Sequence, residues 1–160
     1  MTILGIDPGS VRVGYGLIAR NKNSFVYHTS GLLPIPDGEQ GAQLFTLERS
    51  LEKVIDAGPH PDVAVVEKLF FTKNKKTAIR VAQARGVIIK TLAAHGIPIE
   101  ELSPSSIKLA VTGSGTADKK AVAKMVALTL GIDVHKRIDD ETDALAIAIA
   151  GSSLHNAGNR

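Results

Sequence analysis

Two acidic residues, Asp7 and Glu67, end apolar runs that are typical of buried strands. Asp7 follows residues 2–6 and Glu67 follows residues 63–66, and neither run contains a charged residue. An ionised carboxylate in such surroundings costs free energy unless another charge or a cation compensates it. Any fold of this chain must therefore provide a partner for each acid.

A second pair of acids, Asp140 and Asp143, precedes an apolar segment that we predict to be helical. Residues three apart project from one face of a helix, and the helix dipole favours negative charge at its amino-terminal end. The alanines that follow predict close packing of this helix on a sheet, which would bring its acids to the strand ends that carry Asp7 and Glu67. For this pair alone, the competing interpretation is that Asp139 or Asp140 only caps the helix and that Asp143 is an ordinary surface acid.

Four carboxylates at one place repel one another. Burial and like charges raise the pKa of a carboxyl group, and a bound divalent cation is the usual way in which such groups stay ionised. The sequence therefore predicts a site for Mg²⁺ or Mn²⁺ formed by Asp7, Glu67, Asp140 and Asp143. Our hypothesis for the reaction is phosphoryl transfer, in which carboxylate-bound divalent ions are common.

The charges of the chain are unevenly distributed, although its net charge is only +3. Acids crowd into residues 139–143, whereas none occurs in residues 68–99. That stretch is basic and contains Lys68, Lys73, Lys75, Lys76, Arg80, Arg85 and Lys90. A basic surface beside an acidic metal pocket suits a nuclease, because cations hold phosphates and carboxylates hold the metal. A merely solvated helix face is the competing interpretation.

The order of the apolar segments predicts a mixed α/β sheet covered on both faces. The expected strands, of which the first three form an antiparallel meander, are residues 2–7, 11–19, 24–33, 62–67 and 97–102. The expected helices are residues 44–55, 75–95 and 103–110, one that starts at Thr116 or Asp118 and ends at Leu130, and one from Asp139 or Asp140 to about Ala150.

One domain is expected for 160 residues of which 44% are hydrophobic. No apolar run reaches the length of a membrane span and no signal peptide is recognisable, so we expect a cytoplasmic protein without a membrane partner. The absence of cysteine excludes disulfides, thiolate catalysis and cysteine zinc sites. The histidines lie far apart and have no metal-ligand spacing.

Several segments, in the same order along the chain, resemble those of the RuvC family of bacterial Holliday junction resolvases. They are residues 5–9 with 14–16, 66–67 followed by 70–71, 83–86, 113–119 and 140–148. The resemblance extends from Met1 to about Ala150 and includes all the acids named above. It implies a ribonuclease H-like fold of the retroviral integrase superfamily, with a mixed five-stranded sheet in a domain of residues 1–151. Residues 152–160 are expected to form a disordered tail.

The resemblance also implies a homodimeric, structure-selective endonuclease that acts in homologous recombination and DNA repair. The four acids match the family's catalytic and metal-binding carboxylates, with two Mg²⁺ ions per active site that Mn²⁺ can replace. Some relatives have His at the position of Asp140. Symmetric nicks in two strands of like polarity would resolve a four-way DNA junction and leave ligatable 5′-phosphate ends. The RuvA and RuvB branch-migration proteins are implied partners.

A set of aromatic and basic residues are candidates for DNA contacts. They are Phe70, Lys73, Lys75, Lys76, Arg80, Lys108, Lys119 and Lys120. Phe70 matches the family's aromatic residue that stacks on an unpaired base, and Lys108 and Lys119 match basic positions near the scissile phosphate. Core packing of the aromatic residue and ordinary solvation of the basic residues are the alternatives.

Small residues also mark one face of the long helix expected after residue 75. They are Ala78, Ala82 and Gly86, followed by Ile89. In the resolvase family this helix forms much of the dimer contact, and such a face is compatible with that role. Packing of the same face on the chain's own sheet is the alternative.

Two other function classes are weighed against a resolvase. A non-catalytic module that binds branched DNA or RNA would use the acids only as a repulsive rim, whereas an RNA-directed ribonuclease H-like nuclease would share the metal site. The Asp7-Pro8-Gly9 turn with Gly14 and Gly16 is also similar to the first phosphate loop of actin-like and sugar-kinase ATPases, but the chain is short for that duplicated fold.

Overall fold

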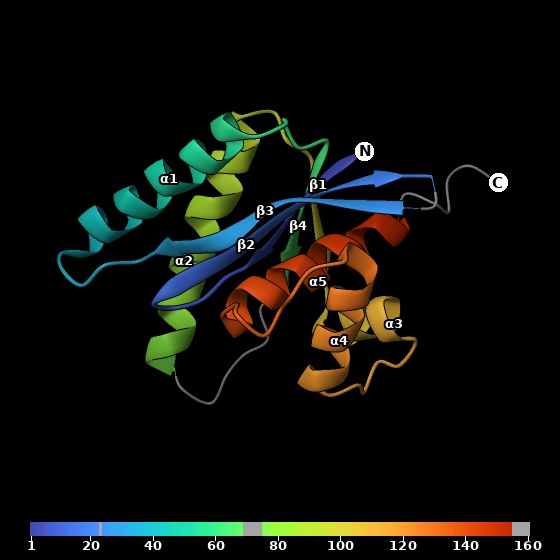
Figure 1. Cartoon of the computed structure of the whole chain (residues 1–160). Coiled ribbons are helices and arrows are strands. Elements are labelled where there is room, and N and C mark those ends of the chain that lie inside the picture. Colours follow the sequence, from blue (N-terminus) through green and yellow to red (C-terminus); the bar gives the residue numbers. More distant parts are fainter. Residues whose placement is uncertain (23, 69–74, 155–160) are drawn as a thin grey trace.

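The computed structural model describes residues 1–22, 24–68 and 75–154. Within these residues, five strands form one sheet in the order β3-β2-β1-β4-β5 (Figure 1). Strand β2 is antiparallel to both β1 and β3, whereas β1 pairs with β4 and β4 pairs with β5 in parallel. The strands are β1 (Thr2–Asp7), β2 (Arg12–Asn21), β3 (Ser24–Pro34), β4 (Val63–Glu67) and β5 (Ile99–Leu102). The predicted meander and mixed sheet are confirmed.

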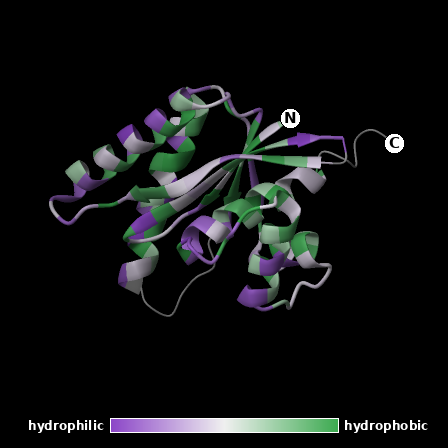
Figure 2. Ribbon diagram, viewed as in Figure 1, coloured by the Kyte–Doolittle hydropathy of each residue, from purple (hydrophilic) through white to green (hydrophobic). Residues whose placement is uncertain are grey.

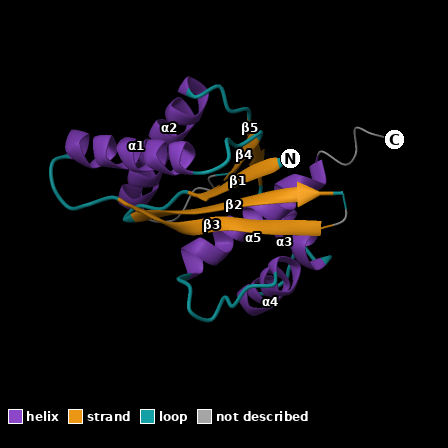
Figure 3. Cartoon of the chain, turned by 45° about the horizontal axis from the view of Figure 1, so that its top comes forward, coloured by secondary structure: helices purple, strands orange, loops and turns teal. Residues whose placement is uncertain are grey.

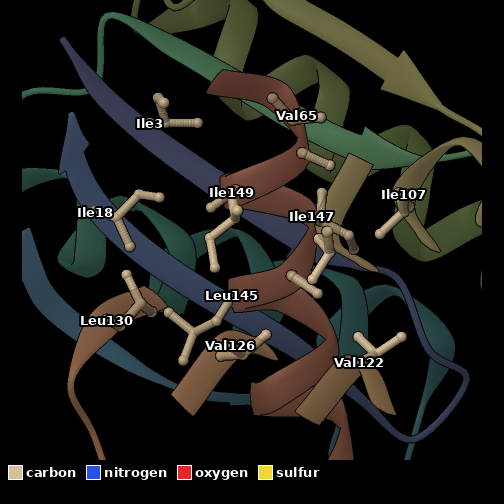
Figure 4. Packing of buried hydrophobic residues seen from close by; sticks show 14 of the residues in the cluster. Ile3, Ile18, Val65, Ile107, Val122, Val126, Leu130, Leu145, Ile147 and Ile149 are labelled. Carbon is tan, nitrogen blue, oxygen red and sulfur yellow. The ribbon is translucent and has the colours of Figure 1, made fainter. Parts of the chain in front are cut away.

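Helices cover both faces of this sheet (Figure 3). One face carries α1 (Gln40–Ala57) and α2 (Lys75–Ala94). The other face carries α3 (Pro104–Thr112), α4 (Lys119–Leu130) and α5 (Asp139–Leu154). Hydrophobic residues gather where these helices face the strands, as Figure 2 shows. Each face therefore has its own apolar core, and Figure 4 shows the one between the sheet and α3, α4 and α5.

The alternation of side chains along β1 determines to which face of the sheet its last residue, Asp7, projects. Ile3 belongs to the core beside α5, and Leu4 belongs to the core beside α1 and α2. Strand β4 alternates in the same way, with its odd-numbered residues on the α5 side. Because successive side chains of a strand point to opposite faces, Asp7 and Glu67 both project toward the side of α5.

Helix α5 packs directly on β1 and β2 through small residues on both partners. A Cβ atom built on Gly5 would lie 2.1 Å from the carbonyl oxygen of Ala144, and one on Gly14 would lie 2.0 Å from that of Asp140. Any side chain at these two positions would push the helix off the sheet. The close packing predicted from the alanines of α5 is thus confirmed. The close approach of α5 requires glycine at position 14, so this residue does not indicate a phosphate-binding loop.

Local signals explain several helix ends. The Ser103 hydroxyl accepts a 3.1 Å hydrogen bond from the Ser106 N–H and caps α3, as predicted. The Asp118 carboxylate accepts a 2.8 Å bond from the Ala121 N–H, so α4 begins at Lys119. Helix α5 continues to Leu154, beyond the predicted end, so Ser152, Ser153 and Leu154 of the predicted tail are helical. Residues 155–160 lie outside the described part of the chain.

Two residues of the predicted small face of α2, Ala82 and Gly86, do not pack on the chain's own sheet. The buried apolar residues of this helix are Ala84, Ile88 and Leu92, whereas Ala82 and Gly86 are exposed. The alternative in which this face packs on the chain's own sheet is therefore wrong for these two residues, and the face is available to a partner. Among the described helices, none combines the length and the apolar character needed to cross a membrane.

Candidate active site

Asp7 and Glu67 lie side by side at the carboxyl ends of two neighbouring parallel strands. Ile6 of β1 is paired with Val66 of β4, so the acids that follow them leave the sheet together. Both project toward α5, as the strand alternation requires. The two strand ends that carry these acids are therefore neighbours in the sheet.

Helix α5 brings the other two acids to the same place. Asp140 and Asp143 lie in its first turns, and together with Asp7 and Glu67 they line one cleft of about 440 Å³. The cleft walls also include Lys108 of α3 and Lys119 of α4, together with apolar residues of α3, α4 and α5. All four acids predicted from the sequence therefore share one cleft, and two of the predicted basic residues join them.

Burial and mutual repulsion change the acidity of this group. The pKa of Asp7 is raised to about 7, first by burial and then by the charges of Glu67, Asp143 and Asp140. Burial also raises the pKa of Glu67 and of Asp143. The ammonium group of Lys119 opposes the rise at both of these acids. A site that keeps several carboxyl groups so reluctant to ionise is suited to a divalent cation.

Two basic side chains already neutralise part of this charge. The Arg12 guanidinium, from the start of β2, donates a hydrogen bond to Oδ2 of Asp140. The Lys119 ammonium lies 3.3 Å from Oδ2 of Asp143 and 3.8 Å from Oδ2 of Asp139. Arg12 was not predicted from the sequence, since nothing in the pattern around it indicates a partner in α5; it lies at the start of the strand that returns beside β1.

A polar cluster fixes the amino-terminal end of α5 against β3. Nη1 of Arg137 donates to the Ser30 hydroxyl at 2.7 Å and to the Tyr27 hydroxyl at 3.2 Å, and it also pairs with Glu141. The Ser30 hydroxyl in turn donates to Oε1 of Glu141 at 2.6 Å. Because Glu141 lies between Asp140 and Asp143 in the sequence, this cluster holds the helix turn that presents both acids. No pattern in the sequence indicates this cluster.

The four acids suit a divalent cation in type and charge, and they line one cleft. Carboxylate oxygens are the ligands that Mg²⁺ prefers, and the cations that now balance Asp140 and Asp143 are the side chains Arg12 and Lys119. Among the described residues, no three acidic or histidine side chains converge closely enough to hold an ion as they stand. A bound ion would therefore compete with Arg12 for Asp140 and with Lys119 for Asp143.

The other residues predicted to contact DNA do not all lie near the four acids. Lys120 lines a second cleft next to the active site, and Arg80 lies in a separate shallow pocket with Asp37. Lys76 is exposed on α2, and Lys75 begins that helix. Two predicted contacts, Phe70 and Lys73, lie outside the described residues. The structure thus gathers Lys108, Lys119 and Lys120 near the acids but does not bring Arg80 there.

The mixed five-stranded sheet and its edge of four acids define a ribonuclease H-like α/β domain with a carboxylate site typical of a metal-dependent nuclease. Residues 3–151 match the family model for crossover junction endodeoxyribonuclease RuvC. The chain therefore belongs to the RuvC family of hydrolytic nucleases.

Similar proteins support this assignment. Crossover junction endodeoxyribonuclease RuvC of Chloroflexus aggregans is 45% identical over 150 residues, which cover 93% of this chain and 91% of that protein. The protein of the same name from Moorella thermoacetica is 42% identical and covers 96% and 92% of the two chains. Among solved structures, T. thermophilus RuvC in complex with Holliday junction substrate is similar, with a TM-score of 0.91 and 27% identity over 99% of this chain and 96% of that one.

Proposed function

We propose that this protein resolves four-way DNA junctions by metal-dependent nicking of two strands of like polarity, in recombination and repair. The observation that carries the proposal is the convergence of Asp7, Glu67, Asp140 and Asp143 in one cleft of a chain that belongs to the RuvC family. The basic side chains of Lys108 and Lys119 line the same cleft and suit a phosphate group.

The four carboxylates would hold two Mg²⁺ ions, with Mn²⁺ as a substitute. When bound, these ions supply an activated water and offset the negative charge on the leaving 3′ oxygen. Lys108 and Lys119 would orient the scissile phosphodiester above the acids, because both side chains line the cleft beside them. The water oxygen forms a bond to phosphorus as the bond to the 3′ oxygen breaks, which leaves a 5′-phosphate and a 3′-hydroxyl that a ligase can rejoin.

A homodimer would give the reaction its symmetry, since two equal sites about a twofold axis can nick two equivalent strands. The exposed small face of α2 is our candidate for the contact. Ala82 and Gly86 on this face are exposed, whereas Ala84 and Ile88 point into the chain's own core. Small residues allow two helices to approach closely. RuvA and RuvB are proposed partners by membership of the family alone.

Phe70 is our candidate for stacking on an unpaired base at the crossover. It comes three residues after Glu67 in the sequence, next to the basic residues Lys73, Lys75 and Lys76. A Phe70→Ala variant should bind the junction but nick it more slowly, and Phe71→Ala provides the matched control. Equal cleavage by Phe70→Ala and the wild type would remove the stacking role.

The proposal is tested by offering the protein three labelled substrates, with Mg²⁺ and with EDTA. These are a mobile four-way junction, a linear DNA duplex of the same sequence and an RNA–DNA hybrid. We expect Mg²⁺-dependent cleavage of the junction alone. Cleavage of the hybrid instead would identify an RNA-directed nuclease. Tight binding of the junction without a nick in any metal would identify a non-catalytic module.

A further inference from the structure

A second cleft of about 710 Å³ lies directly beside the active site, between α4, the segment of residues 131–138 and the start of α5. Lys119 and Asp143 line both clefts. The two clefts therefore adjoin each other at this pair of residues, and the second one extends from there along α4. Nothing in the reaction described above uses the far part of it.

Charge is distributed unequally along the second cleft. Its acidic side chains are Asp139 and Asp143, at the end next to the active site, where Lys119 pairs with both. The far part is lined by Lys120, Lys124 and His135. All three are exposed, and within the described residues no carboxylate lies within ion-pair distance of either lysine.

The remaining groups of the far part are already engaged or apolar. Arg137 also lines it, but its guanidinium bonds to Ser30 and Glu141. The carboxylate of Asp133 accepts a 2.9 Å hydrogen bond from the backbone N–H of His135. The apolar part of the wall includes Leu128, of which 68% is exposed. Two unpaired lysines beside an apolar wall are suited to an anionic chain that also carries apolar groups.

The spacing of the lysines fits successive phosphates. Lys119 and Lys124 are five residues apart on α4, which corresponds to about 7.5 Å along a helix. A DNA strand carries one phosphate per roughly 3.4 Å of duplex axis. A strand that ran parallel to α4 from a scissile phosphate beside Lys119 would thus place about two further phosphates along this length, within reach of Lys120 and Lys124.

We propose that this cleft holds the sugar–phosphate backbone of the DNA strand next to the nick, with Lys120 and Lys124 on the phosphates and the wall at Leu128 against the sugars. This inference rests on the proposed function and extends it from the cut phosphate to the adjoining arm of the substrate. Phosphate contacts of this kind fix the register of a protein on DNA without reading its sequence. The cleft would thus set which phosphate reaches the four acids.

The test measures equilibrium binding of a four-way junction at several KCl concentrations, with Ca²⁺ in place of Mg²⁺. The variant Lys120→Ala/Lys124→Ala should bind about 5- to 20-fold more weakly, and its salt slope should be shallower by about 1 to 2 because each lost phosphate contact removes roughly 0.9. Lys120→Arg/Lys124→Arg should restore the slope. The control Lys22→Ala/Lys53→Ala removes two exposed charges elsewhere and should leave the slope unchanged. A slope for Lys120→Ala/Lys124→Ala equal to that of the control would overturn the proposal.

A modified substrate separates direct contact from long-range attraction. Uncharged methylphosphonates replace the two phosphates that flank the cut position on one side, then on the other. We expect one of these substrates to weaken binding by the wild type but to add no further loss in Lys120→Ala/Lys124→Ala. Equal losses in both proteins on both sides would show that the lysines do not touch the backbone. Because this readout is binding, it fails independently of the proposed cleavage.

Discussion

The ammonium group of Lys119 lies 3.3 Å from Oδ2 of Asp143. This pair joins α4 to α5 across the mouth of the cleft that holds the other three acids. It lowers the pKa of Asp143 against the effect of burial. The same side chain also lowers the pKa of Glu67, so Lys119 acts on two carboxylates at once.

Loss of Lys119 should therefore change both the rate of cleavage and its pH dependence. We expect Lys119→Ala to cut a saturating junction about 10- to 100-fold more slowly, because a positive charge near the reacting phosphate is removed. The pKa values of Asp143 and Glu67 should rise further, so the increase of rate with pH should move to higher pH. Single-turnover rates from pH 6 to 9, with Lys53→Ala as control, measure both effects. A slow variant with an unshifted profile would contradict the electrostatic role.

Asp7 should make the metal-free protein less stable as the pH rises. Its pKa is raised in the folded protein from 3.8 to about 7. A carboxyl group with a raised pKa contributes its full stability below the unfolded value, and that contribution is lost as the pH rises through 7. In EDTA at pH 8, Asp7→Asn should therefore be more stable than the wild type, by about 1 to 3 kcal/mol.

Thermal melts at pH 5 and pH 8, with and without Mg²⁺, measure this difference. Mg²⁺ should raise the Tm of the wild type and leave that of Asp7→Asn almost unchanged, because bound ligand stabilises only the form that binds it. Asp7→Asn should also abolish cleavage while sparing junction binding. Equal stabilisation of both proteins by Mg²⁺ would show that Asp7 is not a ligand.

Removal of Arg12 should strengthen metal binding in the absence of DNA. Its guanidinium pairs with Oδ2 of Asp140 and would compete with a metal ion for that carboxylate. Exposed ion pairs contribute about 0 to 1 kcal/mol, so Arg12→Ala should lower the Mn²⁺ dissociation constant by up to about fivefold. Arg49→Ala, which breaks an exposed pair with Glu52 on α1, is the matched control. Weaker Mn²⁺ binding by Arg12→Ala would show that Arg12 supports the site instead of competing for it.

A charge on the small face of α2 should separate the two halves of a dimer. Ala82→Glu places a carboxylate at the proposed contact, where it would be desolvated and would face its own copy. We expect sedimentation to show monomers and the junction to be nicked in one strand at a time. Ala94→Glu, at an exposed position near the end of the same helix, should remain dimeric. A dimeric Ala82→Glu protein would place the contact elsewhere.

Strand alternation made half of the site predictable from the sequence. Asp7 and Glu67 end two apolar runs, and a period of two residues puts both on one face of the sheet. The spacing of Asp140 and Asp143 and the alanines of α5 supplied the other half. These signals are local. The two-residue period of a strand and the spacing of three residues on a helix each predict on which side of the element an acid lies.

Contacts between distant segments could not be predicted in this way. Arg12 of β2 reaches Asp140 of α5, and Arg137 joins Tyr27 to Glu141. A long, flexible side chain has no periodic pattern, and its partner is decided by the final packing of the elements that carry it. For the same reason, the sequence showed a small face on α2 but did not show that Ala82 and Gly86 are exposed.

The most direct test of the central claim maps the nicks that the wild-type protein makes on each strand of a mobile four-way junction in Mg²⁺. With each strand labelled in turn, we predict paired nicks at symmetric positions in two strands of like polarity, each with a 5′-phosphate that ligase reseals. The same preparation should leave a linear duplex intact. Unpaired nicks at scattered positions, or equal cleavage of the linear duplex, would contradict a junction-resolving site built on these four acids.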